Sequence, residues 1–290
     1  MMKHFHVCCD GSFGNRYSGL IGGITLARLC DLPVKVSWPS TNMCRAKFYE
    51  LFSTENNFEA SDTNIREYYP IGEQYNLLSC DASYLQFFKS LGRTEPNNMN
   101  IESFRNFVNS SDKPVFYYTP LLYDWIPEEE IKKSIRDLRF SDDVLEKVRN
   151  FIDENELKDG YYGIHLRMTD FVNIESFDVD YWIKTVTDTK DKKFFVCSDD
   201  PDTEARFNEL SNAFSYLKMH KTEKYISEGQ WHHPYTDDDG RHSVFNVERG
   251  SEHVKEAVID FLLLSLSTPF DTGNQSTFLK MAKRVGKALC

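Results

Sequence analysis

The sequence predicts an α/β protein of two Rossmann-like lobes, each built on a parallel sheet, with a cleft between the lobes. Short apolar strands alternate with helical segments along the chain, which is typical of parallel sheets covered by helices. A length of 290 residues with 40% hydrophobic content suits two compact lobes better than one. A polar helical stretch near 142–156 and the Leu-Lys-Asp-Gly after it mark a boundary, so the expected domains are residues 1–155 and 156–290.

The first half opens with a strand, a turn, a helix and a second strand. The first strand covers 4–10, and a turn rich in glycine and asparagine follows at 11–16. The helix is indicated by apolar residues near the 3.6-residue period, namely Leu20, Ile21, Ile24 and Ala27. The second strand is expected at 34–39, whereas residues 53–115 show too little pattern for elements to be assigned.

From residue 160 onward, strands and helices alternate more clearly. Strands are expected at 161–168, 192–199 and 214–219. Helices are expected at 179–189, 201–211, 252–267 and 276–289. Because parallel strands place their carboxyl ends at one edge of a sheet, polar residues at these strand ends are candidates for ligand binding.

The composition excludes several classes of partner. A formal charge of -11 and a pI near 5.3 argue against binding to nucleic acid or to an anionic membrane, so an anionic ligand would have to be held by local groups. The seven cysteines include no Cys-x-x-Cys pair and lie mostly in apolar runs, which predicts reduced core thiols. The longest apolar run, 257–266, is about half a bilayer span, so we expect a cytoplasmic protein with no integral membrane segment.

Two nucleotide-binding motifs and one metal-binding pattern are not supported. The turn at 11–16 is not Gly-x-Gly-x-x-Gly, and the chain has no Gly-x-x-x-x-Gly-Lys-Ser/Thr motif, so NAD binding and P-loop chemistry are disfavoured. The segment 232–242 has three histidines and three aspartates but neither His-Glu-x-x-His nor EF-hand spacing. We interpret it as a solvated loop, with a metal-dependent hydrolase as the alternative.

Two strand ends carry polar side chains. In Gly-Ile-His-Leu-Arg-Met-Thr-Asp, His165 and Arg167 alternate with apolar residues and therefore point to one face. The planar, permanently charged fork of arginine suits a phosphate, although a solvated arginine at an ordinary strand end is the alternative. Asp199 and Asp200 follow the next strand at the same predicted edge; taken alone, they indicate a helix N-cap before Pro201.

The last two helices add two candidate features. Asp260 lies in the middle of an apolar helix, where an unpaired carboxylate is costly. We interpret it either as part of a buried structural salt bridge or as an acceptor for a ligand's donors, such as N1-H and the 2-amino group of guanine. Gln275, Ser276 and Thr277 stand at the start of the final helix, whose N-terminal amides favour a phosphate, with a plain cap as the alternative.

These motifs resemble those of the inverting, metal-independent fucosyltransferases of the GT-B type, especially the core and nodulation-factor α1,6-fucosyltransferases. The resemblance rests on His-Leu-Arg-Met-Thr-Asp-Phe-Val-Asn-Ile-Glu, on Cys-Ser-Asp-Asp-Pro, on Ala-Val-Ile-Asp-Phe-Leu-Leu-Leu-Ser followed by Gln-Ser-Thr-Phe, and on the opening Gly-Ser-Phe-Gly-Asn-Arg. It covers the second half well and residues 53–150 hardly at all. It implies a GT-B-like fold, with the N-terminal lobe on the acceptor side and the C-terminal lobe binding the GDP-sugar.

The resemblance also implies roles in binding the donor. His165 would contact the guanine and Arg167 the β-phosphate of GDP-fucose, while Asp260 would bind guanine and Ser276 the β-phosphate. The family's second arginine is replaced by Met168 in this sequence, which leaves the identity of the sugar open. The further candidates for donor binding are Asp199, Asp200, Thr277, Asn15 and Arg16.

For catalysis, the resemblance assigns the general base to Glu175, which ends the matching motif, and Asp170 is the second candidate. We therefore expect transfer of a sugar from GDP to a hydroxyl of an oligosaccharide or glycoconjugate acceptor, with inversion. L-fucose is the sugar that the resemblance favours. No metal is expected. No cofactor is expected either, since GDP-fucose would be consumed as the donor substrate. The alternatives are a related transferase for another nucleotide sugar and a catalytically silent GDP-sugar binding protein.

Overall fold

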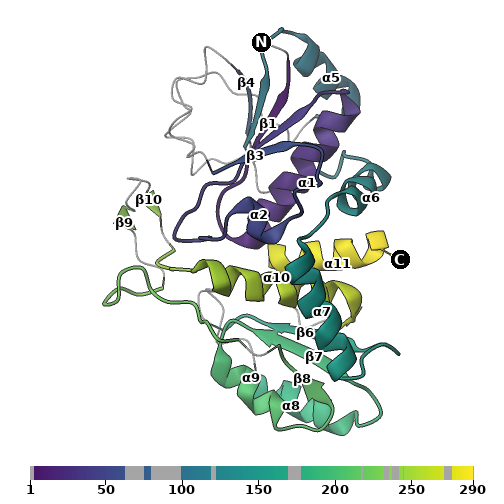
Figure 1. Ribbon diagram of the computed structural model, residues 1–290, viewed down its shortest axis with the longest axis vertical. Coiled ribbons are helices and arrows are strands. Elements are labelled where there is room, and N and C mark those ends of the chain that lie inside the picture. The colour runs from purple at the N-terminus through teal and green to yellow at the C-terminus, as the bar shows by residue number, and fades with distance from the viewer. Residues whose placement is uncertain are drawn as a thin grey trace. The chain divides into compact units, whose positions relative to one another are not determined.

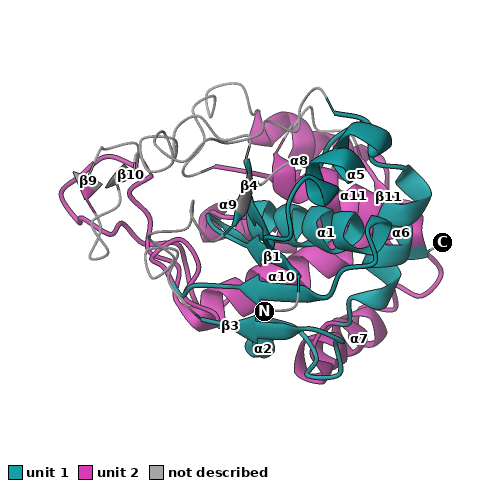
Figure 2. Ribbon diagram, turned by 90° about the horizontal axis from the view of Figure 1, so that it is seen from above, with its two compact units in different colours: residues 1–40, 47–139, 289 teal, residues 41–46, 140–288, 290 magenta. Residues whose placement is uncertain are grey.

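The computed structural model has two parallel sheets, one in each of two compact units, and so confirms the α/β prediction (Figure 1, Figure 2). Unit 1 comprises residues 1–40, 47–139 and 289, and unit 2 comprises residues 41–46, 140–288 and 290. The structure describes residues 3–62, 75–79, 99–118, 122–168, 178–216, 218–231, 235–236, 242–243, 245–270 and 276–289. None of the helices in these ranges is long and apolar enough to cross a membrane.

Unit 1 holds a five-stranded parallel sheet in the order β3-β2-β1-β5-β4. Its strands are β1 (Phe5–Cys8), β2 (Val34–Ser37), β3 (Glu59–Ser61), β4 (Asn76–Ser79) and β5 (Val115–Tyr118). Its helices are α1 (Phe13–Leu29), α2 (Phe48–Leu51), α5 (Ile101–Asn109) and α6 (Glu128–Asp137). The strand, helix and second strand predicted at the start of the chain are confirmed as β1, α1 and β2.

The turn between β1 and α1 is shorter than the sequence predicts. Gly11 has φ of +83°, a conformation that glycine adopts without steric cost, and it reverses the chain within a few residues of the strand. Helix α1 begins at Phe13. The prediction that Asn15 and Arg16 lie in a turn is therefore wrong, because both belong to the first turn of α1.

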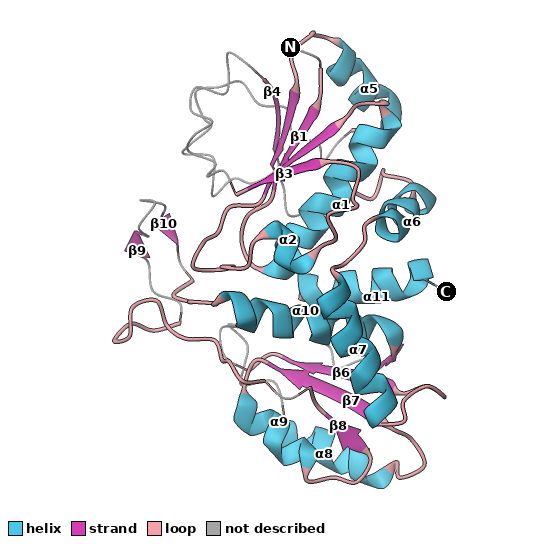
Figure 3. Cartoon of the chain, in the orientation of Figure 1, coloured by secondary structure: helices cyan, strands magenta, loops and turns pink. Residues whose placement is uncertain are grey.

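Unit 2 holds a four-stranded parallel sheet in the order β11-β6-β7-β8, with a separate antiparallel pair (Figure 3). The strands of this sheet are β6 (Tyr162–Leu166), β7 (Phe194–Ser198), β8 (Ala213–Phe214) and β11 (Thr268–Pro269). The antiparallel pair is β9 (Tyr235–Thr236) and β10 (His242–Ser243). The helices are α7 (Asp142–Glu154), α8 (Val179–Asp188), α9 (Pro201–Asn208), α10 (Ser251–Leu266) and α11 (Thr277–Leu289).

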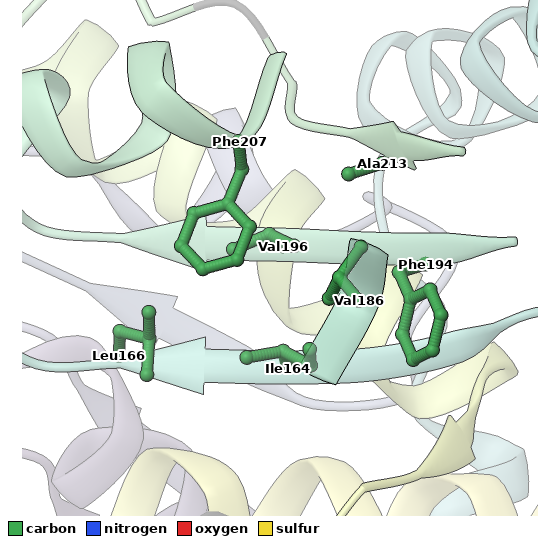
Figure 4. Close-up of a cluster of buried hydrophobic side chains, with 7 residues drawn as sticks. All are labelled: Ile164, Leu166, Val186, Phe194, Val196, Phe207 and Ala213. Atoms are coloured by element: carbon green, nitrogen blue, oxygen red, sulfur yellow. The ribbon is translucent and has the colours of Figure 1, made fainter. Parts of the chain in front are cut away.

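The sheet of unit 2 is apolar on both faces, as expected for a parallel sheet covered by helices. One face carries a buried cluster in which Val186 of α8 and Phe207 of α9 pack on the strands (Figure 4). The cluster consists of Ile164, Leu166, Val186, Phe194, Val196, Phe207 and Ala213. On the other face, Phe151 of α7 contacts Phe195 of β7 with ring centroids 5.6 Å apart. Helices α7 and α10 also pack together within this unit.

The change from unit 1 to unit 2 follows residue 139, earlier than the boundary expected after residue 155. Helix α7 belongs with unit 2 because it packs on α10 and because Phe151, on the buried face that it forms with Val144 and Val148, contacts Phe195 of β7. The amphipathic pattern of this helix shows that one face is buried. It does not specify which of the two sheets the face packs against.

The strand predicted at 214–219 is mostly absent from the sheet. Strand β8 consists of Ala213–Phe214 and pairs with β7 at Phe194 and Phe195. Beyond it, Lys218 is buried and binds polar groups of β7 and α10. Met219, by contrast, is 76% exposed, so the segment beyond β8 does not continue the buried strand.

Candidate functional site

The carboxyl end of β6 lies at the point where the strand order of unit 2 reverses. The chain runs from β6 to β7 and β8 on one side, and later returns to place β11 on the other side of β6. Ligands of open parallel sheets bind beyond the carboxyl ends of the strands at such a switch point. His165 is the penultimate residue of β6, and Arg167 follows the strand directly.

His165 is held as a neutral side chain. It is 8% exposed, and its ring stacks on Phe278 of α11 with centroids 5.2 Å apart. Burial, together with the nearby charges of Arg167 and Lys218, lowers the pKa of His165 to about 3. At neutral pH its imidazole therefore has one nitrogen that donates and one that accepts.

The two aspartates after β7 have different partners. Asp199 Oδ1 accepts a hydrogen bond from Met168 N at 2.5 Å, so the ends of β6 and β7 are joined, as the predicted common edge requires. Asp200 is the N-cap of α9, and its Oδ2 accepts from Thr203 N at 3.0 Å. The N-cap interpretation thus applies to Asp200, and a contact of either aspartate with a donor molecule stays a prediction.

Asp260 has the buried salt bridge that the sequence left as one of two interpretations. Its side chain is 6% exposed, and its Oδ2 lies 2.8 Å from Lys218 Nζ. Lys218 Nζ also donates to Ser198 O at 2.7 Å and contacts Glu204 Oε1. Sequence reasoning missed Lys218 and Glu204. The available signal was Lys218 inside the expected strand Phe-Ser-Tyr-Leu-Lys-Met, since a lysine is rarely buried without a partner, whereas Glu204 lies in a polar segment and gave no signal.

The second oxygen of Asp260 is not satisfied by this salt bridge. Asp260 Oδ1 is buried, and no hydrogen-bond donor in the described part of the chain lies within reach of it. Burial raises the pKa of Asp260 to about 6, although Lys218 opposes the shift. Burial likewise raises the pKa of Glu204 to about 7. For Lys218, burial alone would lower the pKa, but Asp260 and Glu204 together raise it above its usual value.

The start of α11 lies against β6 and α10. Phe278, in the first turn of α11, stacks on His165 and meets Phe261 of α10 edge to face with centroids 5.4 Å apart. Ser276 is buried and caps the helix, because its Oγ accepts from Leu279 N at 3.2 Å. The cap interpretation therefore holds for Ser276, and its contact with a phosphate stays a prediction.

A close approach between α11 and α10 positions the last helix within unit 2. Thr277 is the first residue of α11 and is partly buried. Near the other end of the helix, a Cβ on Gly286 would lie 2.3 Å from Ser265 O, so only glycine permits this close approach of α11 to α10. At the first turn of the same helix, the stacking of Phe278 on His165 places the helix N-terminus beside the end of β6.

Asn15 and Arg16 lie in unit 1, and Arg16 has a structural role there. Its side chain is 0% exposed. It donates to Gly11 O at 2.7 Å and to Pro39 O at 2.6 Å, and its guanidinium lies 5.2 Å from the centre of the Trp38 ring. These bonds tie the loop after β1 to the loop after β2. The contact of Asn15 with a donor or acceptor stays a prediction.

Several predicted positions lie outside the described residues. They are Asp170, Glu175, Gln275 and most of 232–242. The roles proposed for these positions rest on the sequence motifs alone.

The chain is similar in structure to two kinds of fucosyltransferase. The structure of NodZ from Bradyrhizobium matches with a TM-score of 0.58 and 12% identity, over 98% of this chain and 93% of that chain. NodZ α1,6-fucosyltransferase soaked with GDP-fucose matches with a TM-score of 0.59 and 12% identity, over 98% and 93% of the two chains. POFUT1 in complex with GDP-fucose gives a TM-score of 0.53 and 14% identity, over 98% and 94%.

At the level of sequence, no protein-family model and no curated protein matches the chain. The structural similarity extends over both units and agrees with the resemblance of the motifs. This chain therefore has the fold of the GT-B fucosyltransferases.

Proposed function

We propose that the protein transfers a sugar, with L-fucose as the favoured one, from GDP to a hydroxyl of an oligosaccharide or glycoconjugate acceptor, with inversion and without a metal ion. The fold shared with fucosyltransferases supports this. The observation that carries the proposal is the buried Asp260 Oδ1, which has no donor among the described residues and belongs to a helix packed on β6 and β7. An edge of guanine would supply the missing donors through N1-H and its 2-amino group.

The leaving group would be stabilised by the charge and dipoles at the same sheet edge. As the glycosidic bond breaks, negative charge builds on the β-phosphate of GDP. Arg167 supplies a permanent positive charge there, and the first turn of α11 after Ser276 supplies backbone amides and a helix dipole. Preorganised donors of this kind lower the barrier because they need no reorganisation during the reaction.

The acceptor hydroxyl would lose its proton to Glu175. The assignment comes from the resemblance of the motif that begins at His165, and Asp170 is the second candidate. A carboxylate in this role must lie within hydrogen-bond reach of the hydroxyl oxygen as the new bond forms. Inversion then follows because the hydroxyl attacks from the side opposite to GDP.

One observation favours the alternative of another nucleotide sugar. Met168 stands where the family has a second arginine, and its side chain packs against the apolar cluster of unit 2. This position therefore adds no positive charge to that of Arg167. A sugar nucleotide with different demands on the phosphate clamp would fit this change, and so would a protein that binds GDP-sugars without transferring them.

The first experiment compares GDP with UDP as ligands of the whole protein. GDP should raise the free energy of unfolding by about 2.7 kcal/mol at a hundredfold excess over its dissociation constant. UDP should have little effect, because uracil lacks the guanine edge. Equal stabilisation by the two nucleotides would contradict the guanine assignment.

The second experiment concerns catalysis. The protein should hydrolyse GDP-fucose slowly in the absence of acceptor, and EDTA should leave this activity unchanged. Binding without any hydrolysis would favour the silent binding protein, whereas loss of activity with EDTA would favour metal-dependent chemistry. A glycan array incubated with labelled GDP-fucose would then identify the acceptor.

A further inference from the structure

We infer that Lys218 is a positioning residue for nucleobase recognition: it fixes the Asp260 carboxylate through Oδ2, so that Oδ1 is presented to the guanine edge as a hydrogen-bond acceptor. The inference rests on the proposed function, since it takes guanine as the ligand of Asp260. It assigns a role to a residue that belongs to none of the recognised motifs.

The contacts of Lys218 within the protein exclude a direct contact between its ammonium and a ligand. Its ammonium has three acceptors, which are Asp260 Oδ2 at 2.8 Å, Ser198 O at 2.7 Å and Glu204 Oε1. An ammonium has three N-H donors, so all of them are used within the protein. The side chain is also 6% exposed. Lys218 therefore cannot turn toward a phosphate, and its charge acts on a ligand only through the carboxylate that it holds.

The same contacts tie the carboxylate to the end of β7. Glu204 Oε1 accepts from Ser198 N at 2.7 Å, while the carbonyl of Ser198 accepts from Lys218. Ser198 is the last residue of β7 and pairs with Leu166 at the end of β6. Asp260 is thus aligned on the strand ends where His165 and Arg167 stand, which links the position for the base to the position for the phosphate.

The charge balance makes the state of Asp260 depend on Lys218. One ammonium faces two buried carboxylates, Asp260 and Glu204. Among the described residues, the other titratable groups that interact electrostatically with one of these three are His165 of β6, Cys197 of β7, Tyr216, and His253 and Glu256 of α10. An ionised Asp260 accepts hydrogen bonds from N1-H and the 2-amino group of guanine. The O-H of a protonated Asp260 would instead face these N-H donors. Lys218 therefore decides whether the base is recognised.

The test measures the dissociation constant of GDP by calorimetry between about pH 5 and about pH 8, the range in which the carboxylates titrate. In the wild type, affinity should fall about tenfold for each pH unit below the pKa of Asp260, which is about 6. Lys218→Met should move this midpoint to higher pH and weaken GDP binding at neutral pH by about tenfold or more. Glu204→Gln should move the midpoint to lower pH, because Asp260 is then the one carboxylate that faces the Lys218 ammonium.

The matched control is Lys184→Met, which removes a lysine from an exposed ion pair with Asp188 in the same unit. It should leave the midpoint and the affinity unchanged. If Lys218 had only a structural role, Lys218→Met would weaken GDP binding equally at every pH. The midpoint would then not move in opposite directions in Lys218→Met and Glu204→Gln. If Lys218→Met does not fold, the shift in Glu204→Gln decides the matter by itself, because glutamine keeps the shape and the acceptor oxygen.

A double variant separates the two hypotheses. If Lys218 acts through Asp260, then Lys218→Met should weaken GDP binding no further in an Asp260→Asn background. Additive losses, or an unchanged midpoint in both single variants, would overturn the inference while preferential GDP binding by the wild type still supported the proposed function. A wild type that does not distinguish GDP from UDP would overturn both.

Discussion

Met168 N donates a hydrogen bond to Asp199 Oδ1 at 2.5 Å, and this contact joins the chain beyond β6 to the chain beyond β7. Arg167 lies between that bond and the last paired residue of β6, Leu166. Its backbone is therefore fixed on both sides before any ligand binds. Fixed groups stabilise developing charge more than mobile ones, because they cost no reorganisation.

The first prediction concerns Arg167. Arg167→Ala should lower turnover about a hundredfold to a thousandfold, the usual effect of removing one preorganised donor to a developing charge. Arg167→Lys should recover little, because an ammonium cannot reproduce the planar fork. Steady-state kinetics with GDP-fucose would measure both. Arg206→Ala, at an exposed ion pair of α9, is the matched control and should retain activity; full activity in Arg167→Lys would show that Arg167 is only a surface charge.

The second prediction concerns the stability of unit 1. Arg16→Met should lower the free energy of unfolding, because the carbonyls of Gly11 and Pro39 would lose their donor while buried. Each unsatisfied buried group costs about 1–3 kcal/mol. Urea denaturation would measure the loss. Arg28→Met, in the last turn of the same helix, removes a partly exposed ion pair and should cost less than about 1 kcal/mol. Equal losses in the two variants would be inconsistent with the structural role of Arg16.

The third prediction concerns pH and His165. Burial, with a further contribution from Arg167, lowers the pKa of His165 to about 3 in the folded protein. In the unfolded chain the pKa is about 6.5, so below that pH the unfolded state binds a proton that the folded state does not. The contribution of neutral His165 to stability is present above about pH 6.5 and is lost as the pH falls, by about 1.4 kcal/mol per unit.

His165→Asn removes this titration. The difference in unfolding free energy between wild type and variant should therefore change in favour of the variant by about 2 kcal/mol between about pH 6.5 and about pH 5. Urea denaturation of both proteins at several pH values measures it. A difference that stays constant with pH would mean that folding does not lower the pKa of His165.

The sequence predicts the strands of unit 2 well where a strand is buried on both faces, because such a strand is mostly apolar along its length. The apolar stretches of β6 and β7 identify the two strands, and the polar residues directly after them identify the edge at which a ligand is expected. Parallel pairing then brings Arg167 and Asp199 to that edge without further information. The strand expected at 214–219 instead ends at Phe214, and beyond it the buried side chain of Lys218 reaches Asp260 of α10.

Contacts between distant segments could not be predicted in the same way. Residues 41–46 belong to unit 2, where Arg45 forms two bonds to Glu248 at 2.7 Å and 3.1 Å and Asn42 Nδ2 donates to Val247 O at 2.8 Å. No periodicity links these segments, because each is an irregular loop. The partner of Asp260 is hidden for the same reason, since Lys218 lies in a stretch without helix or strand.

The last prediction concerns Glu175, whose role rests on the resemblance of its motif. A general base must take the proton of the acceptor hydroxyl, while the donor would be held independently by Arg167, Asp260 and Ser276. Glu175→Gln keeps the shape and the hydrogen-bonding reach of the side chain but removes its basicity. Turnover should therefore fall about a hundredfold to ten-thousandfold, the usual contribution of general base catalysis, while GDP affinity hardly changes.

Two measurements on this variant, GDP affinity and turnover, distinguish the possible roles of Glu175. A loss of turnover with normal GDP binding is expected of the base, because proton transfer contributes only when the acceptor reacts. Near-normal turnover would remove Glu175 from the mechanism and make Asp170 the next residue to test, through Asp170→Asn. A parallel loss of GDP binding would instead assign Glu175 to the structure of the donor site, because a base that acts only in the chemical step leaves the affinity for the nucleotide unchanged.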